Sequence, residues 1–254
     1  GTHYQLLWTH LIPATMEGKA THNVQNAMFA AALAFSMGKT LDDIRHGLRT
    51  FNSTIFQAPG RMNVFDEHPF RVILDYGHNA AAIASISQLV DRLEVNERRI
   101  CVLAAPGDRR DEDIQAIAKE AAGHYDFYIC KADDHRRGRD EDEVPRMLRA
   151  TLLEAGVDDG QIEIIPNESE AVDAALNMAR DGDLVVIFGD NIERCWKQVA
   201  GHQIADEGLL DEAPETPVQS FVEEDPEAFT LDPDSELIID ERGVRIARID
   251  EESD

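Results

Sequence analysis

Apolar runs and helical segments alternate regularly between residues 70 and 188, and this alternation constrains the fold more than any other feature of the sequence. Strands are expected at five short apolar runs, at 70–74, 100–104, 127–131, 162–165 and 184–188. Helices are expected at the four segments between them, at 80–93, 111–122, 144–153 and 169–179. Strands that alternate with helices of about 10–15 residues form a mostly parallel sheet covered on both faces. The sequence therefore predicts an α/β fold with a Rossmann-like domain.

Two further segments flank this domain. Residues 1–57 are expected to form a helical unit, and residues 58–202 the Rossmann-like domain. Residues 203–254 are dominated by acids and interrupted by prolines, and such a segment cannot bury enough apolar surface to order itself. The sequence therefore predicts an acidic, largely disordered tail. Two alternating apolar runs within the tail indicate a hairpin at 236–248.

Charge and cysteine usage exclude several classes of function. The formal net charge of -26 argues against nonspecific nucleic-acid binding, which needs a basic face. No apolar run of about 18 residues occurs, so no membrane span is expected. The three cysteines lie far apart, in a spacing that fits neither a zinc site nor a disulfide framework. We therefore expect a cytoplasmic protein, and the histidines show no ligand spacing that would predict a metal site.

Polar residues cluster where the first predicted strand ends. Asp75, Tyr76, His78 and Asn79 lie in the turn between the strand at 70–74 and the next helix. Ligands of open α/β sheets bind at this edge, outside the carboxyl ends of the strands. Asp75 could accept hydrogen bonds from ribose hydroxyls, and Arg61, after a Pro-Gly turn, could contact phosphate. The alternative is an aspartate that caps the helix and an arginine paired on the surface.

Two asparagines mark the start of an alanine-rich helix predicted over 24–36. Asn23 and Asn26 are three residues apart, so both can face the same side. Their amides offer a donor and an acceptor together, which suits an adenine edge. The alternative is that they only cap the helix.

Two charged loops follow the next strands of the predicted sheet. Their interleaved residues are Asp108, Arg109 and Arg110 in one loop and Asp134, Arg136 and Arg137 in the other. In a right-handed parallel arrangement these loops converge with the turn after residue 75. Arginine suits a carboxylate and aspartate suits an amino or guanidinium group, so the loops could bind a zwitterionic substrate. The alternative is a self-neutralising surface network.

Three short motifs together resemble the Mur ligase superfamily: His-Asn-Val-Gln-Asn-Ala at 22–27, Pro-Gly-Arg at 59–61 and Asp-Tyr-Gly-His-Asn at 75–79. Within it, three further segments are similar to the C-terminal part of the cyanophycin synthetase family, at 57–65, 107–111 and 134–139. The resemblance extends over most of the chain before the acidic tail.

This resemblance implies an ATP-dependent amide ligase that works through an acyl phosphate. In that family the Mur-like half joins arginine to the aspartate side-chain carboxylates of a poly-aspartate backbone. The implied partners are ATP with Mg²⁺, arginine, an aspartate-containing polymer or dipeptide, and upstream central and ATP-grasp domains of the same parent chain. A homo-oligomer is also implied. Residues 1–57 would then be the end of the central ATP-binding domain.

The resemblance also assigns roles to residues. The nucleotide-binding set is Asn23, Asn26, Arg61, Asp75, Tyr76 and His78. The substrate-binding set is Asn79, Asp108, Arg109, Arg110, Asp134, Arg136 and Arg137. No catalytic residue and no metal ligand is assigned to this chain, because no Gly-x-x-x-x-Gly-Lys-Ser/Thr loop occurs in it and the magnesium ligands belong to the upstream domain.

Departures from the family pattern leave alternatives open. Gly77 and Ala80 stand where the family usually has Ala and Pro, and Phe-Gly-Asp-Asn at 188–191 stands where peptidoglycan ligases carry Gly-Lys-Gly-His-Glu. Another Mur-type ligase, acting on folylpolyglutamate or peptidoglycan precursors, is one alternative. A non-catalytic interface module, which polymerises β-Asp-Arg only through the ATP-grasp half, is the other.

Overall fold

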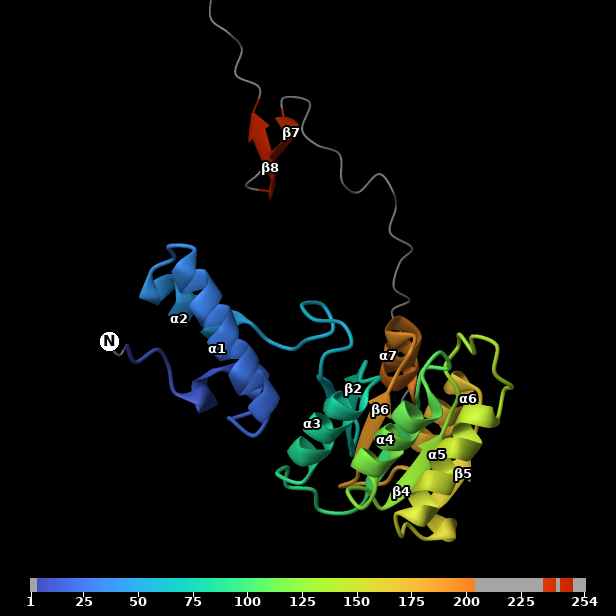
Figure 1. The fold of residues 1–254 in the computed structure, drawn as a ribbon. Coiled ribbons are helices and arrows are strands. Elements are labelled where there is room, and N and C mark those ends of the chain that lie inside the picture. Colours follow the sequence, from blue (N-terminus) through green and yellow to red (C-terminus); the bar gives the residue numbers. More distant parts are fainter. Residues whose placement is uncertain (1–3, 204–234, 241–242, 249–254) are drawn as a thin grey trace, which may run out of the picture. The chain divides into compact units, whose positions relative to one another are not determined.

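The computed structural model describes residues 4–203, 235–240 and 243–248 (Figure 1). The chain divides into two units, Gly1–Ala205 and Asp206–Asp254, which are described separately. The prediction of a disordered tail falls mainly on residues outside the described ranges. In the second unit, β7 (Ser235–Asp240) and β8 (Gly243–Arg248) pair antiparallel, with Asp240 opposite Gly243.

A six-stranded sheet forms the centre of the first unit. Its strands are β1 (Asn63–Phe65), β2 (Arg71–Asp75), β3 (Arg99–Leu103), β4 (Phe127–Cys130), β5 (Ile162–Ile164) and β6 (Leu184–Phe188). They lie in the order β1-β2-β6-β3-β4-β5. Every neighbouring pair is parallel except β1 and β2. The predicted Rossmann-like, mostly parallel sheet is confirmed.

Helices cover both faces of this sheet, as predicted. One face carries α3 (Ala80–Val90), α4 (Asp111–Ala121) and α5 (Glu143–Glu154), and the other carries α6 (Glu168–Met178) and α7 (Ile192–Gly201). The pleat of β6 explains the two cores, because successive side chains of a strand point to opposite faces. Val186 packs with α3, α4 and α5, whereas Val185 and Ile187 pack with α6 and α7.

The position of β6 determines where a ligand can enter. The strand returns between β2 and β3, and the helix that follows it lies on the opposite face from the helices that follow its two neighbours. The turns after β2, β6, β3 and β4 therefore gather at one edge, around a point where the chain directions diverge. Ligands of open α/β sheets bind at such a point.

The residues before the sheet form a helical part, with α1 (Thr21–Ser36) and α2 (Leu41–Thr50) preceded by the short 3-10 helices η1 (Thr9–Leu11) and η2 (Pro13–Thr15). Thr40 begins α2 with a capping box, in which its hydroxyl accepts the Asp43 N–H and the Asp43 carboxylate accepts the Thr40 N–H. No helix among residues 4–203 combines the length and the apolar character needed to cross a bilayer.

Candidate functional site

Four residues of the predicted nucleotide-binding set lie together at the carboxyl end of β2. The Arg61 guanidinium carbon lies 6.0 Å from the centre of the Tyr76 ring, within the range of a cation–π contact. The His78 ring packs edge-on against the Tyr76 ring, with 4.8 Å between centroids. Asp75 is the last residue of β2, and the positive charge of Arg61 acts to lower the pKa of its carboxyl group. The structure thus gathers Arg61, Asp75, Tyr76 and His78 on one rim.

Asp75 is held by the backbone that crosses it. Its Oδ2 atom accepts the Met62 N–H at 2.9 Å, and the residue is 7% exposed. Burial raises the pKa of the Asp75 carboxyl, while the hydrogen bond from Met62 and the charge of Arg61 act to lower it. The carboxylate keeps further acceptor positions, because each of its oxygens has two lone pairs.

His78 has a defined tautomer. Its Nδ1 atom lies 2.8 Å from the Tyr76 carbonyl oxygen. A carbonyl can only accept, so Nδ1 carries the proton and Nε2 of the neutral ring remains an acceptor. The side chain can therefore accept one hydrogen bond from a ligand at the rim.

Met62 connects this rim to α1. The residue is buried, and its backbone has the left-handed φ of 50°, which is uncommon for a side chain of this size. Its sulfur lies 3.0 Å from His22 Nε2 and 3.6 Å from Asn23 Nδ2. Asn23 also donates to the Ala14 carbonyl, and Asn26 donates to the Asn23 oxygen. The structure therefore joins Asn23 and Asn26 to each other, and Asn23 to the residue that holds Asp75.

The turn before β1 packs tightly against α7. Gly60 has a φ of +69°, and a Cβ at this position would lie 2.8 Å from Ile192 Cγ1. Its N–H is bound by the side chain of buried Asn63, and its carbonyl accepts the Tyr76 N–H. Only glycine meets both the conformation and the space, so this turn fixes where Arg61 leaves the backbone.

Asn79 serves as the N-cap of α3, since its side chain accepts the Ala82 N–H. Its predicted contact with substrate stays a prediction.

The two charged loops are bound to each other. Arg137 pairs with Asp108 at 3.1 Å, and Arg139 donates to the carbonyls of Gly107 and Arg109. A Cβ on Gly107 would lie 2.3 Å from the Arg136 carbonyl oxygen, so the loops touch through their backbones. The two loops therefore lie in contact with each other, and their charges neutralise one another.

Three more of the predicted substrate residues, Arg110, Asp134 and Arg136, have charged partners. Arg110 pairs with Asp113 one turn along α4, and Arg136 pairs with Glu141. Asp134 pairs with Arg194 of α7 through both carboxylate oxygens, at 2.9 and 2.8 Å.

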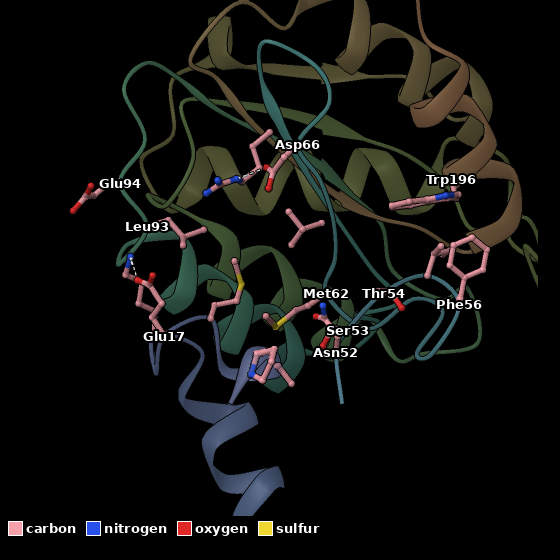
Figure 2. Close-up of a pocket in the computed structure, with 17 residues that line it drawn as sticks. Glu17, Asn52, Ser53, Thr54, Phe56, Met62, Asp66, Leu93, Glu94 and Trp196 are labelled. Carbon is pink, nitrogen blue, oxygen red and sulfur yellow. Dashed lines mark hydrogen bonds and ion pairs between the residues drawn. The ribbon is translucent and has the colours of Figure 1, made fainter. Parts of the chain in front are cut away.

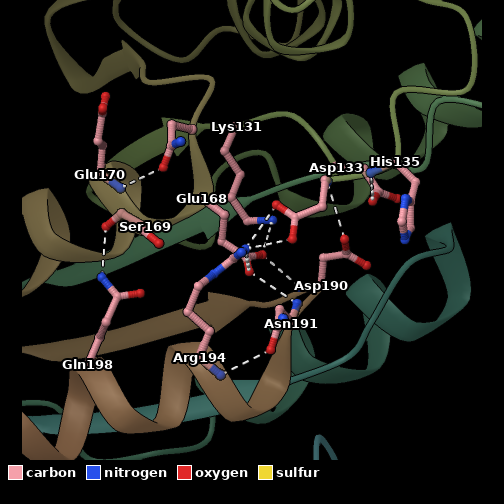
Figure 3. Close-up of polar contacts among 12 residues, drawn as sticks. Lys131, Asp133, His135, Glu168, Ser169, Glu170, Asp190, Asn191, Arg194 and Gln198 are labelled. Atoms are coloured by element: carbon pink, nitrogen blue, oxygen red, sulfur yellow. Dashed lines mark hydrogen bonds and ion pairs between the residues drawn. The ribbon is translucent and has the colours of Figure 1, made fainter.

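Beneath the second loop lies a buried ionic network that the sequence reasoning did not identify (Figure 3). Lys131 Nζ lies 2.7 Å from Glu168 Oε2, and both side chains are fully buried. Burial acts to raise the pKa of Glu168. The charge of Lys131 and the hydrogen bonds that the Glu168 carboxylate accepts outweigh burial and lower this pKa to about 2. Burial and a hydrogen bond with Asp133 raise the pKa of Asp190. The signal available in the sequence was Lys131 itself, a lysine that directly continues an apolar strand.

A narrow crevice lies between the turn after β2 and the ionic network. Its lining includes Tyr76, His78, Lys131, Asp133 and Asp190. A larger hollow of about 810 Å³ lies elsewhere, beside β1 (Figure 2). Its lining includes Met62, Phe56 and Trp196, but none of the predicted site residues. The candidate site is therefore the crevice at the carboxyl edge of the sheet.

Among the described residues, no three side chains of His, Cys, Asp or Glu are grouped so that they could hold a metal ion. The part of the chain that the structure describes thus offers no fit for Mg²⁺ on its own.

A protein-family model described as "Mur ligase, glutamate ligase domain" matches residues 60–191 of the chain. The chain therefore belongs to the Mur ligase family. It is 36% identical over 221 residues to the cyanophycin synthetase of Trichormus variabilis, across 83% of this chain and 24% of that protein. The similarity to cyanophycin synthetases expected from the motifs is confirmed. The chain spans about a quarter of the length of these curated relatives.

Solved structures agree on the fold. FolC of E. coli, in complex with ADP and without folate substrate, matches with a TM-score of 0.53 and 23% identity, over 69% of this chain and 39% of that one. The UDP-N-acetylmuramate-alanine ligase MurC of Thermotoga maritima matches with a TM-score of 0.52 and 18% identity, over 71% of this chain and 37% of that one.

Proposed function

We propose that this chain is the C-terminal portion of an ATP-dependent amide ligase of cyanophycin synthesis. ATP phosphorylates a side-chain carboxylate of a poly-aspartate backbone, which gives an acyl phosphate and ADP. The α-amino group of arginine attacks the acyl carbon, and the amide bond forms as phosphate leaves. The similarity to cyanophycin synthetases over 83% of the chain supports these substrates.

The observation that carries the proposal is the cluster of Arg61, Asp75, Tyr76 and His78 at the carboxyl end of β2. A carboxylate with spare acceptor positions suits ribose hydroxyls, and a guanidinium suits phosphate. Asn23 and Asn26 line a separate groove along α1, and Asn23 is linked to this cluster only through its contact with Met62, the residue that holds Asp75. The cluster thus has the groups that a nucleotide requires, on an edge where nucleotides bind.

Residues 1–57 are, in this proposal, the end of a central ATP-binding domain. Three side chains of α1, Met28, Phe29 and Leu33, are 67%, 70% and 65% exposed. Ala27, Ala30 and Ala34 of the same helix line a second, apolar groove. A helix that is apolar all round is normally buried within a larger protein, which supports the assignment.

The two charged loops and the crevice would receive the incoming amino acid. Mg²⁺ would accompany the phosphates of ATP, and no residue of the described part is assigned to it. A homo-oligomer and an ATP-grasp partner domain remain predictions.

Amino-acid-dependent ADP release tests the proposal. The full gene product would be incubated with ATP, Mg²⁺ and a poly-aspartate primer, with arginine, glutamate or diaminopimelate as the acceptor amine. We expect ADP release that depends on arginine and exceeds that with the other amino acids at least tenfold.

Other outcomes would contradict the proposal. Activity only with glutamate on a folate, or with diaminopimelate on a muramoyl peptide, would indicate a different Mur-type ligase. Polymerisation of β-Asp-Arg that survives Asp75→Ala, without arginine-dependent ADP release, would indicate a non-catalytic module.

A further inference from the structure

Glu168 joins several elements at the carboxyl edge of the sheet (Figure 3). It is the first residue of α6, and its side chain is fully buried. Its Oε2 atom lies 2.7 Å from Lys131 Nζ and accepts the Asp190 N–H at 2.7 Å. Its Oε1 atom accepts the Asn191 N–H at 3.0 Å and an Arg194 Nη2 proton at 2.6 Å. One carboxylate therefore holds the end of β4, the turn after β6 and the first turn of α7.

The network continues into the loop after β4. The Arg194 Nη2 atom that contacts Glu168 also contacts both oxygens of Asp134, at 2.9 and 2.8 Å. The Asp134 N–H in turn donates to Asp190 Oδ2 at 3.2 Å. Glu168, Arg194, Asp134 and Asp190 thus form a closed circuit, and Asp134 belongs to the loop that would face the incoming amino acid.

Stability alone does not account for this arrangement. Replacing a buried ion pair by apolar side chains of similar volume is often neutral or stabilising, because the charges no longer have to leave water. The Lys131–Glu168 pair is buried in full, whereas the groups it supports, Asp134 and Arg194, have side chains 34% and 35% exposed at the rim. The buried Lys131–Glu168 pair therefore holds Arg194 and Asp134 in defined positions, and a ligand at the surface can reach both side chains.

We propose that Glu168 is a positioning residue, which holds the loop 133–139 in place for the incoming amino acid through Arg194 and Asp134. The tether itself follows from the contacts of Glu168. The ligand that the loop receives rests on the proposed function.

The variant that tests the proposal is Lys131→Met with Glu168→Gln. Glu168→Gln alone would leave a buried lysine without a negative partner and could unfold the protein. The double variant removes both charges. The introduced glutamine amide keeps one oxygen, which can accept the N–H of either Asp190 or Asn191 but not of both in the present geometry, and the charge that holds Arg194 is lost.

Asp183→Asn is the matched control. Asp183 is also a fully buried carboxylate paired with an arginine, Arg98, at 2.6 Å, but it lies at the opposite edge of the same sheet. A change there perturbs stability without touching the loop 133–139.

Two measurements on the full gene product are needed. Hydrogen exchange of the amides in 133–139 should be at least tenfold faster in the double variant and unchanged in Asp183→Asn. The KM for arginine should rise at least tenfold in the double variant, while the KM for ATP stays within twofold. A merely structural role would move both constants together, or neither.

Unchanged exchange at 133–139 would overturn the tether. Faster exchange with an unchanged KM for arginine would overturn the positioning role. Should the wild type show no arginine-dependent ADP release, the proposed function fails, and the exchange measurement still decides whether Glu168 holds the loop.

Discussion

The two edges of the sheet each bury a carboxylate against an arginine, yet the two sites are built differently. At the amino edge, Asp183 accepts the backbone N–H groups of Arg98 and Arg180 as well as the Arg98 guanidinium. All of these partners lie in the turns that enter β3 and β6. The Asp183 carboxylate therefore links the turn before β3 to the turn before β6, and these contacts do not extend to another loop.

At the carboxyl edge, Glu168 contacts a fully buried lysine, Lys131, and one arginine, Arg194, which also reaches Asp134 in another loop. The same chemistry therefore serves a different purpose at each edge. Local partners fix the path of the backbone at the amino edge, whereas a chain of charged partners orients exposed groups at the carboxyl edge. This difference matches the general rule that open α/β sheets bind ligands at their carboxyl edge.

The largest effect is expected from Glu168→Gln. The change leaves Lys131 buried without a counter-charge, so the free energy of unfolding should fall by about 3–5 kcal/mol. Urea unfolding at neutral pH measures this loss. Adding Lys131→Met should recover most of it, and a loss below about 1 kcal/mol in the single variant would contradict the burial argument.

Acid should weaken the carboxyl-edge network. The folded-state pKa of Glu168, about 2, lies below its ordinary value of 4.5. The carboxylate therefore contributes stability that is present above pH 4.5 and lost as the pH falls toward 2. At pH 3 roughly 2 kcal/mol of that contribution should be gone.

The check is a comparison of urea midpoints at pH 6 and pH 3. The gap between wild type and the Lys131→Met, Glu168→Gln variant should move in favour of the variant at pH 3. An unchanged gap would show that Glu168 keeps an ordinary pKa.

A smaller loss is expected from Asp183→Asn. The asparagine amide keeps one oxygen, which can accept one of the two backbone N–H groups, and the Arg98 side chain, 38% exposed, can turn to water. The free energy of unfolding should fall by about 1–2 kcal/mol. Thermal or urea unfolding measures it, and a loss as large as that of Glu168→Gln would remove the distinction between the edges.

The smallest effect is expected from Glu193→Gln on α7. Glu193 pairs with Lys197 one turn further along, but the two side chains are 79% and 75% exposed. Exposed pairs of this kind contribute little to stability. The urea midpoint should stay unchanged within error, and a clear shift would show that the charge of α7 matters beyond Arg194.

The sequence predicted the sheet and the cluster of polar side chains at the carboxyl end of β2. Short apolar runs placed the strands at 70–74 and 184–188, and the rule on carboxyl ends placed Asp75 and His78 at the rim. These features depend on local pattern, which a single sequence carries.

Three features depended on contacts between distant residues and were missed. β1 is three residues long and forms only against β2, so it has no pattern of its own. Glu168 follows an asparagine N-cap, where an acid is common for local reasons, and nothing nearby indicates its partners Lys131 and Arg194. Met62, with its left-handed φ, donates its N–H to Asp75, thirteen residues away, and no local pattern indicates either feature.

α7 could have been predicted. Asn191 caps it, and Ile192, Cys195, Trp196 and Val199 follow at helical spacing.

The most direct test of the account is the KM for ATP of Asp75→Asn in the full gene product. The asparagine oxygen can still accept the Met62 N–H, so the rim stays folded while the carboxylate that would meet the ribose is lost. We expect this KM to rise at least tenfold, with the KM for arginine within twofold of the wild-type value. Arginine-dependent ADP release with an unchanged KM for ATP would contradict the assignment of the β2 rim to the nucleotide.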